Sequence, residues 1–121
     1  MTSLSRRRAE AWGRRAERRA ALFLMLKGYR ILSRRYRTPW GEIDLVIRRG
    51  GTLAFVEIKA RRGETEGLEA ITPTARRRIA RAAEAFLAAF PASPQAVRFD
   101  VVVIMPHRLP RHLPGAWRSD D

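Results

Sequence analysis

Two apolar runs joined by a glycine pair occupy the middle of this 121-residue sequence. Residues 43–47 and residues 53–59 each have the composition of a β-strand, and Gly50-Gly51 between them is typical of a two-residue hairpin turn. This turn fixes a register in which Asp44 lies opposite Glu57 on one face of the sheet. Like charges that face each other destabilise a sheet. The hairpin therefore predicts a compensating partner for the two carboxylates, and a divalent cation would serve.

Lys59 strengthens this prediction. It follows Glu57 by two positions, so both side chains project from the same face of the strand. The chain has 25 basic residues, of which only Lys27 and Lys59 are lysines. Lysine is a compact point charge that suits phosphate contact or water activation. Asp44, Glu57 and Lys59 together have the composition of a minimal metal-dependent phosphodiesterase, with two metal ligands and one base or electrostatic stabiliser.

The alternative is a charged strand end, with Lys59 bridging Glu57 or Glu42 in solvent. Residues 53–56 are apolar on both faces, however, which is typical of a central, buried strand. Charges on such a strand need a partner or a function because their burial is costly. This observation favours the catalytic interpretation.

The charge balance of the chain points to a polyanionic partner. The formal net charge is +13 and the pI is near 11.7, and nucleic acid is the simplest partner for such a charge. The absence of cysteine excludes a disulfide framework and a thiolate metal site. We find no signal peptide and no apolar run as long as a membrane span, so we expect a cytoplasmic protein with no membrane partner.

The remaining patterns predict an α/β domain. Apolar residues at helical spacing predict a helix over residues 6–27, and a β-branched run predicts a strand over residues 97–104. A second long helix should begin at Thr72, a favourable N-cap that is followed by proline. We expect residues 1–105 to form one domain around a mixed sheet of four or five strands. Residues 106–121 should form a proline-rich basic tail, docked or partly disordered.

Basic residues on two segments are candidates for phosphate contact. Several of them crowd the first turns of the second helix, where positive charge opposes the helix dipole. Others follow the second strand of the hairpin, in a loop that is expected at the mouth of the site. Phosphate binding would explain the unfavourable placement, whereas a solvated basic face is the alternative. The candidate nucleic-acid-binding residues are Arg61, Arg62, Arg76, Arg77 and Arg78.

Glu17 and Trp40 each have two interpretations. Glu17 borders the apolar stripe of the first helix, and it either approaches the carboxylate site or pairs with Arg14 or Arg18. Trp40 precedes the hairpin and could stack on a base or a sugar, although we expect it to cap the core.

Polar residues in the C-terminal third have simpler expectations. Asp100 should anchor Arg98 or a backbone amide, since it lies inside an apolar strand. His107 and His112 are the only histidines, and their spacing suits neither a metal pair nor a catalytic dyad. We therefore expect both on the surface.

These motifs resemble those of known proteins. Asp44, Glu57 and Lys59 follow the pattern Asp-x12-Glu-x-Lys, which looks like that of the PD-(D/E)xK nuclease superfamily, with Ile43 in place of the usual proline. The closer resemblance is to the YraN-like family of uncharacterised bacterial proteins, over roughly residues 12–104. The matching positions are Gly13 with Glu17, residues 41–45, residues 55–59 with Arg61, and residues 98–102.

The resemblance implies a restriction-endonuclease-like fold, a mixed sheet flanked by helices, similar to that of archaeal Holliday junction resolvases. It implies a nuclease in which Asp44 and Glu57 hold Mg²⁺ or Mn²⁺, Lys59 takes part in catalysis, and Glu17 approaches the site across the helix–sheet interface. Structured or branched DNA is then expected rather than RNA, and analogy with the resolvases suggests a homodimer. One departure is Ala75, where the family often has a lysine. The alternative function is a nucleic-acid-binding protein that keeps the fold without turnover.

Overall fold

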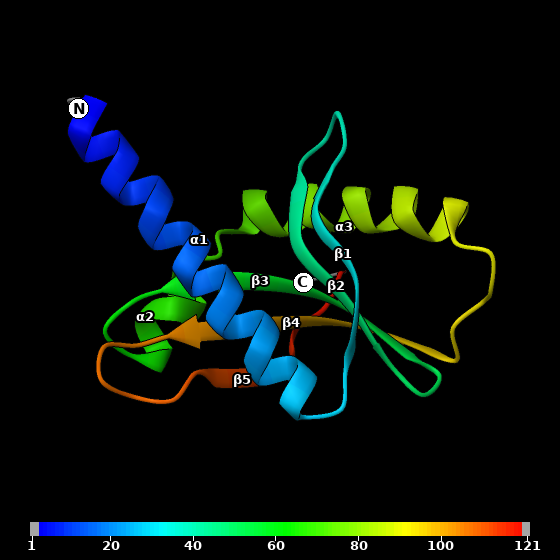
Figure 1. The fold of residues 1–121 in the computed structure, drawn as a ribbon. Helices are drawn as coiled ribbons and strands as arrows, with labels where there is room; N and C mark the ends of the chain where they lie inside the picture. The colour runs from blue at the N-terminus through cyan, green and yellow to red at the C-terminus, as the bar shows by residue number, and fades with distance from the viewer. Residues whose placement is uncertain (1–2, 120–121) are drawn as a thin grey trace.

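The computed structural model describes residues 3–119, and the side chains of residues 12–119. The predicted α/β class is confirmed. None of the helices within this range is long and apolar enough to cross a lipid bilayer. The elements are α1 (Ser3–Leu26), β1 (Arg30–Arg37), β2 (Glu42–Arg49), β3 (Thr52–Ala60), α2 (Glu64–Glu69), α3 (Pro73–Ala89), β4 (Ala96–Ile104) and β5 (Arg111–Trp117) (Figure 1).

One five-stranded sheet runs through the domain in the order β1-β2-β3-β4-β5. The β3–β4 pair is parallel and the other pairs are antiparallel, so the sheet is mixed as predicted. The glycine turn sets the expected register, which runs from Arg49 opposite Thr52 to Leu45 opposite Val56. The parallel pair requires a crossover, and α2 and α3 supply it.

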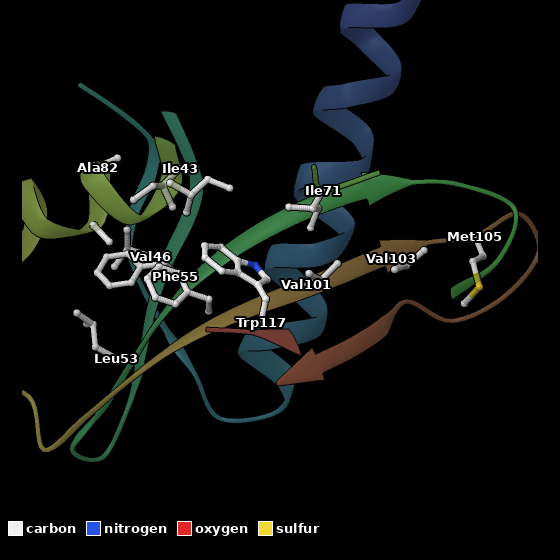
Figure 2. Close-up of a cluster of buried hydrophobic side chains, with 13 residues drawn as sticks. Ile43, Val46, Leu53, Phe55, Ile71, Ala82, Val101, Val103, Met105 and Trp117 are labelled. Carbon is white, nitrogen blue, oxygen red and sulfur yellow. The ribbon is translucent and has the colours of Figure 1, made fainter. Parts of the chain in front are cut away.

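The two faces of the sheet carry separate hydrophobic cores. On one face α3 packs through residues that include Ile79 and Ala82, against Phe55 and Val101 of the central strands. Figure 2 shows this cluster extending along the sheet to Trp117. On the other face α1 crosses the strands, and its small residues, such as Ala20, let it lie close to the sheet. The helix α3 begins as predicted, because Thr72 Oγ1 accepts a hydrogen bond from the Ala75 amide at 3.1 Å.

The segment after residue 105 differs from the expected tail. Residues 111–117 form β5, which pairs with β4 and completes the sheet. Trp117 is buried, and its ring stacks on Phe99 with 4.2 Å between the ring centroids. Pro106 and Pro110 precede β5, and Pro114 is compatible with it because β5 is an edge strand, where a missing backbone N–H is tolerated.

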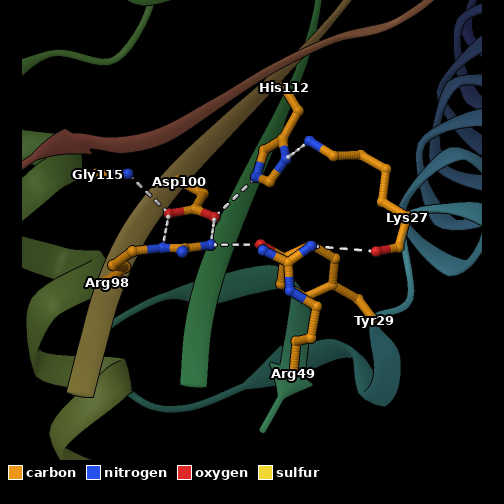
Figure 3. A network of polar contacts seen from close by, with 7 residues as sticks. All are labelled: Lys27, Tyr29, Arg49, Arg98, Asp100, His112 and Gly115. Carbon is orange, nitrogen blue, oxygen red and sulfur yellow. Dashed lines mark hydrogen bonds and ion pairs between the residues drawn. The ribbon is translucent and has the colours of Figure 1, made fainter. Parts of the chain in front are cut away.

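A buried polar network ties β5 to the end of α1 (Figure 3). Asp100 is its centre: it accepts two hydrogen bonds from Arg98, at 2.8 and 3.1 Å, and one from the Gly115 amide at 2.9 Å, as its predicted anchoring role requires. Burial favours the neutral acid, but hydrogen bonds with His112, Arg98 and Gly115 hold the pKa of Asp100 below its ordinary value.

His112 is the second member of this network, and the prediction that it lies on the surface is wrong. It is 7% exposed, its Nε2 lies 2.8 Å from Asp100, and its Nδ1 lies 2.6 Å from Lys27 Nζ. His107 is exposed, as expected. The network therefore accounts for Asp100 and His112 as structural groups that join three distant segments.

Candidate active site

The strands β2 and β3 separate from each other where the sequence places its acidic residues. Their ladder ends at Leu45 opposite Val56. Beyond this pair, residues 42–43 of β2 remain paired with β1, and residues 57–60 of β3 remain paired with β4. The sheet is thus forked, and Figure 1 shows the β1–β2 end rising away from β3 and β4. Asp44 begins one arm of the fork and Glu57 begins the other.

Asp44 lies in the fork because the alternation of side chains between the two sheet faces is interrupted in β2 at this point. Ile43 packs into the core under α3, whereas Leu45 packs into the core under α1. Residues two apart on a regular strand share one face, so the strand is twisted between them. The Asp44 carboxylate consequently substitutes for a backbone acceptor: its Oδ2 accepts a hydrogen bond from the Ile58 amide at 2.8 Å.

This twist corrects the expectation that Asp44, Glu57 and Lys59 share a single face. Glu57 and Lys59 line a cleft of about 270 Å³ on the α3 side. Asp44 lines a second pocket, on the α1 side, together with Glu17 and Ile58. Asp44 and Glu57 nevertheless lie close enough across the fork for Asp44 to raise the pKa of the Glu57 carboxyl group.

Glu57 has the most perturbed carboxyl group of the site. Its side chain is 14% exposed. Burial, followed by the charge of Asp44 and the hydrogen bond with it, raises the pKa of Glu57 from 4.5 to about 9. Lys59 acts in the opposite direction, with its Nζ 3.9 Å from Glu57 Oε1. At neutral pH the pair of carboxylates therefore retains one proton unless a cation joins it.

Glu17 faces the fork from α1, but its ion pair differs from both predicted pairs. Its Oε2 lies 2.8 Å from Nε of Arg35 on β1, and neither Arg14 nor Arg18 is its partner. Hydrogen bonding with Glu17 raises the pKa of Arg35, to which the charge of Asp44 also contributes. Arg35 has a φ of 51°, in the left-handed region that costs a non-glycine residue of order 1 kcal/mol or more. The backbone of β1 is thus strained at the residue whose guanidinium pairs with Glu17 and lines the same pocket as Asp44.

The five candidate basic residues separate into three groups. Arg78 lines the cleft with Glu57 and Lys59, and Arg77 lines the adjoining surface pocket. Arg76 turns away from both, since its Nε donates to the Ile71 carbonyl and its guanidinium lies 6.0 Å from the centroid of the Trp117 ring. Arg61 and Arg62 are exposed beside the end of β3.

The chain matches the family model described as uncharacterised protein family UPF0102 over residues 16–104. Proteins named UPF0102 protein are similar to it along most of their length. That of Nitrobacter winogradskyi is 55% identical over 87% of this chain and 90% of its own. That of Sphingopyxis alaskensis is 49% identical over 95% of this chain and 99% of its own. The chain belongs to the UPF0102 family. The predicted YraN-like family membership is thereby confirmed.

The region matched by the family model contains the fork and the residues from Glu17 to Arg78 that line its pockets, but stops before β5. Two residues of the site escaped the sequence reasoning. Arg35 is one of several arginines on β1, and no periodicity distinguishes it from the others. Arg81, which lines a pocket beside Arg78, belongs to the basic cluster on the first turns of the second helix but is not among the five candidates named from the sequence. The spacing of Arg77, Arg78 and Arg81, which places them on adjacent helical positions, was the available signal.

Proposed function

We propose that this protein is a divalent-metal-dependent phosphodiesterase that acts on nucleic acid, with DNA as the expected substrate. The observation that supports this proposal best is the forked sheet, in which the carboxyl groups of Asp44 and Glu57 meet with Lys59 Nζ 3.9 Å from one of them. Two half-buried carboxyl groups placed close together destabilise a sheet unless a partner compensates their charge.

The donor groups of the fork fit a hard cation such as Mg²⁺ or Mn²⁺. Such ions are bound by one or two carboxylates and keep water or phosphate oxygens for the rest. The Ile58 amide points into the fork, and the carbonyl of the same strand residue points to the same side, which offers a third oxygen. No group of three or more His, Cys, Asp and Glu side chains suited to a metal occurs among the described residues. Asp44 and Glu57 would therefore hold the ion with backbone, water and substrate oxygens.

A bound ion of this kind supplies an activated water and neutralises charge on the phosphate. The protein's own side chains then have separable roles. Lys59 lies beside Glu57 in the cleft, where it orients the attacking water or stabilises negative charge on the phosphoryl group. Arg78 lines the same cleft and holds the phosphate. Glu17, which forms an ion pair with Arg35, lines the Asp44 side of the fork and acts as a positioning residue.

The charge of the chain supports a nucleic-acid substrate over a small phosphodiester. A formal charge of +13 on 121 residues gives long-range attraction to a polyanion. Binding should therefore weaken steeply with salt, because each neutralised phosphate releases counterions. Arg61 and Arg62, exposed beside the end of β3, are placed to extend such contacts beyond the cleft.

The test is cleavage of linear duplex, single-stranded, flapped and four-way DNA with Mg²⁺ or Mn²⁺. Asp44→Asn and Glu57→Gln should abolish cleavage and retain nucleic-acid binding, because each removes a metal ligand and leaves the basic residues in place. Lys59→Ala should abolish cleavage and retain metal binding by calorimetry, and Lys59→Arg should not restore it, since a guanidinium is planar and bulkier. Glu69→Gln, an exposed carboxylate at the end of α2, is the matched control.

Two results would contradict the proposal. Cleavage that persists in Asp44→Asn and Glu57→Gln would place the activity elsewhere. Tight, salt-dependent binding without cleavage of any substrate by either metal would favour the alternative of a nuclease-like fold that only binds nucleic acid.

A further inference from the structure

Trp40 is an exposed aromatic residue at the edge of the proposed active site. It lies between β1 and β2 and is 47% exposed, so the expectation that it caps the core is not met. Among the described residues no aromatic ring and no cation stacks on it. A single exposed aromatic residue is ordinary on a protein surface, so its meaning depends on what holds it and what surrounds it.

The turn that carries Trp40 is held rigidly against α3. Thr38 Oγ1 accepts hydrogen bonds from the amides of Trp40 at 3.2 Å and Gly41 at 3.1 Å, and it donates to the Gly41 carbonyl at 2.8 Å. Gly41 also packs tightly on the helix, where an added Cβ would lie 3.1 Å from the Arg78 Cβ. The backbone that carries Trp40 is thus held in place, so little backbone entropy would be lost when a ligand stacks on the ring.

Beside the ring lies a strongly basic pocket of about 340 Å³, lined by Trp40, Thr74, Arg77, Arg78 and Arg81. Arg78 and Arg81 make no hydrogen bond or ion pair with another described residue, and Arg77 donates only to Thr74 Oγ1, at 3.3 Å. A second pocket at the ring is lined by Arg81, Glu84 and Ala85, so a carboxylate offsets the arginine there. The excess positive charge therefore lies in the pocket with Arg77 and Arg78, and Arg78 also lines the Glu57 cleft.

We infer that the site takes a nucleic-acid strand with an unpaired base, which stacks on Trp40 while the adjacent phosphate lies among Arg77, Arg78 and Arg81. Inside a continuous duplex both faces of a base are covered by its neighbours, so a base must leave the stack to reach a protein ring. The substrate class is consequently a single strand, a flap or a junction, and not an uninterrupted duplex. This inference rests on the proposed function, because it places the stacked nucleotide beside the phosphate that is cleaved.

The test measures binding by the full chain in EDTA, where no cleavage takes place. A labelled short oligothymidylate and a blunt duplex of equal length are titrated, with fluorescence anisotropy as the readout. Trp40→Ala should weaken binding of the oligothymidylate by about ten-fold, which lies within the usual value of one base stack, and leave duplex binding almost unchanged. Trp40→Phe should retain most of the affinity, because it keeps a ring.

Trp12 provides a matched control. It is 48% exposed and lies on the basic helix α1, outside the pocket that Trp40 lines. Trp12→Ala should affect both ligands little. In a Trp12→Phe background, tryptophan emission should be quenched by the oligothymidylate and not by the duplex, since the other tryptophan, Trp117, is buried.

Equal losses on both ligands in Trp40→Ala, or the same selective loss in Trp12→Ala, would overturn the inference. Its failure is distinguishable from failure of the proposed function. If the protein cleaves nucleic acid with a metal but Trp40→Ala has no selective effect, only the stacking site is contradicted. If Trp40→Ala has the selective effect but the protein cleaves no substrate, the stacking site is supported and the nuclease activity is contradicted.

Discussion

The contact between Asp44 and Glu57 makes a quantitative prediction about stability. The folded state raises the pKa of Glu57 from 4.5 to about 9, so between these values it holds a proton that the unfolded chain has lost. Stability should therefore fall as pH rises from 4.5 towards 9. At 1.36 kcal/mol per pH unit, the interval from 4.5 to pH 7 corresponds to about 3 kcal/mol. Relaxation of the fork would reduce this value.

Glu57→Gln removes this penalty while keeping a donor for Asp44. In the absence of divalent ions, the variant should be about as stable as the wild type near pH 4.5 and more stable by about 3 kcal/mol at pH 7. In a domain of this size that difference is roughly 10 °C in the thermal midpoint. Thermal unfolding followed by circular dichroism across this pH range measures it, with Glu69→Gln as the control for loss of one charge.

Magnesium should remove most of this difference. An ion held by both carboxylates stabilises only the folded wild type, by about 2.7 kcal/mol at one hundred times its dissociation constant, and should leave Glu57→Gln almost unchanged. A stability difference between the two proteins that stays constant from pH 5 to pH 8 would refute the reasoning, because it would mean that Glu57 does not retain a proton in the folded state.

Two further predictions separate neighbouring residues that look equivalent in the sequence. Arg78→Ala should weaken binding of all nucleic acids and flatten the salt dependence of that binding. Arg76→Ala should leave the affinity unchanged because that side chain lies over Trp117. Similar losses of affinity for the two variants in anisotropy titrations would contradict this prediction. Asp100→Ala should lower the free energy of unfolding in urea by about 3–5 kcal/mol, because it leaves the partly buried Arg98 without its carboxylate. A loss below about 1 kcal/mol would contradict a stabilising role for the network around Asp100.

The sequence predicted features that depend on local chemistry. The glycine pair determines the hairpin register whatever the rest of the chain does, and the Thr72 cap begins α3 from its own backbone geometry. The β5 strand was missed because proline is a local argument against a strand, whereas the edge position that tolerates it is a property of the whole sheet.

Tertiary contacts account for the other differences. Asp44 does not share a sheet face with Glu57 because β2 twists where Ile43 and Leu45 pack into opposite cores. Neither of these two residues, taken alone in the sequence, indicates the twist. His112 is buried because Lys27, 85 positions away, approaches it from α1. Such contacts depend on where each helix packs on the sheet, and the spacing of residues in the sequence does not specify this position.

Asp44 holds the fork together as well as facing it, and this affects how other members of the family should be read. A relative that had lost catalysis would still need an acceptor for the Ile58 amide, since a buried amide left unpaired costs about 1–3 kcal/mol. Aspartate at this position is therefore expected in active and inactive descendants alike. The side chains of Glu57 and Lys59 have no such structural role toward the backbone. Under the proposed function, joint retention of these two residues is the better criterion for separating catalytic from non-catalytic relatives.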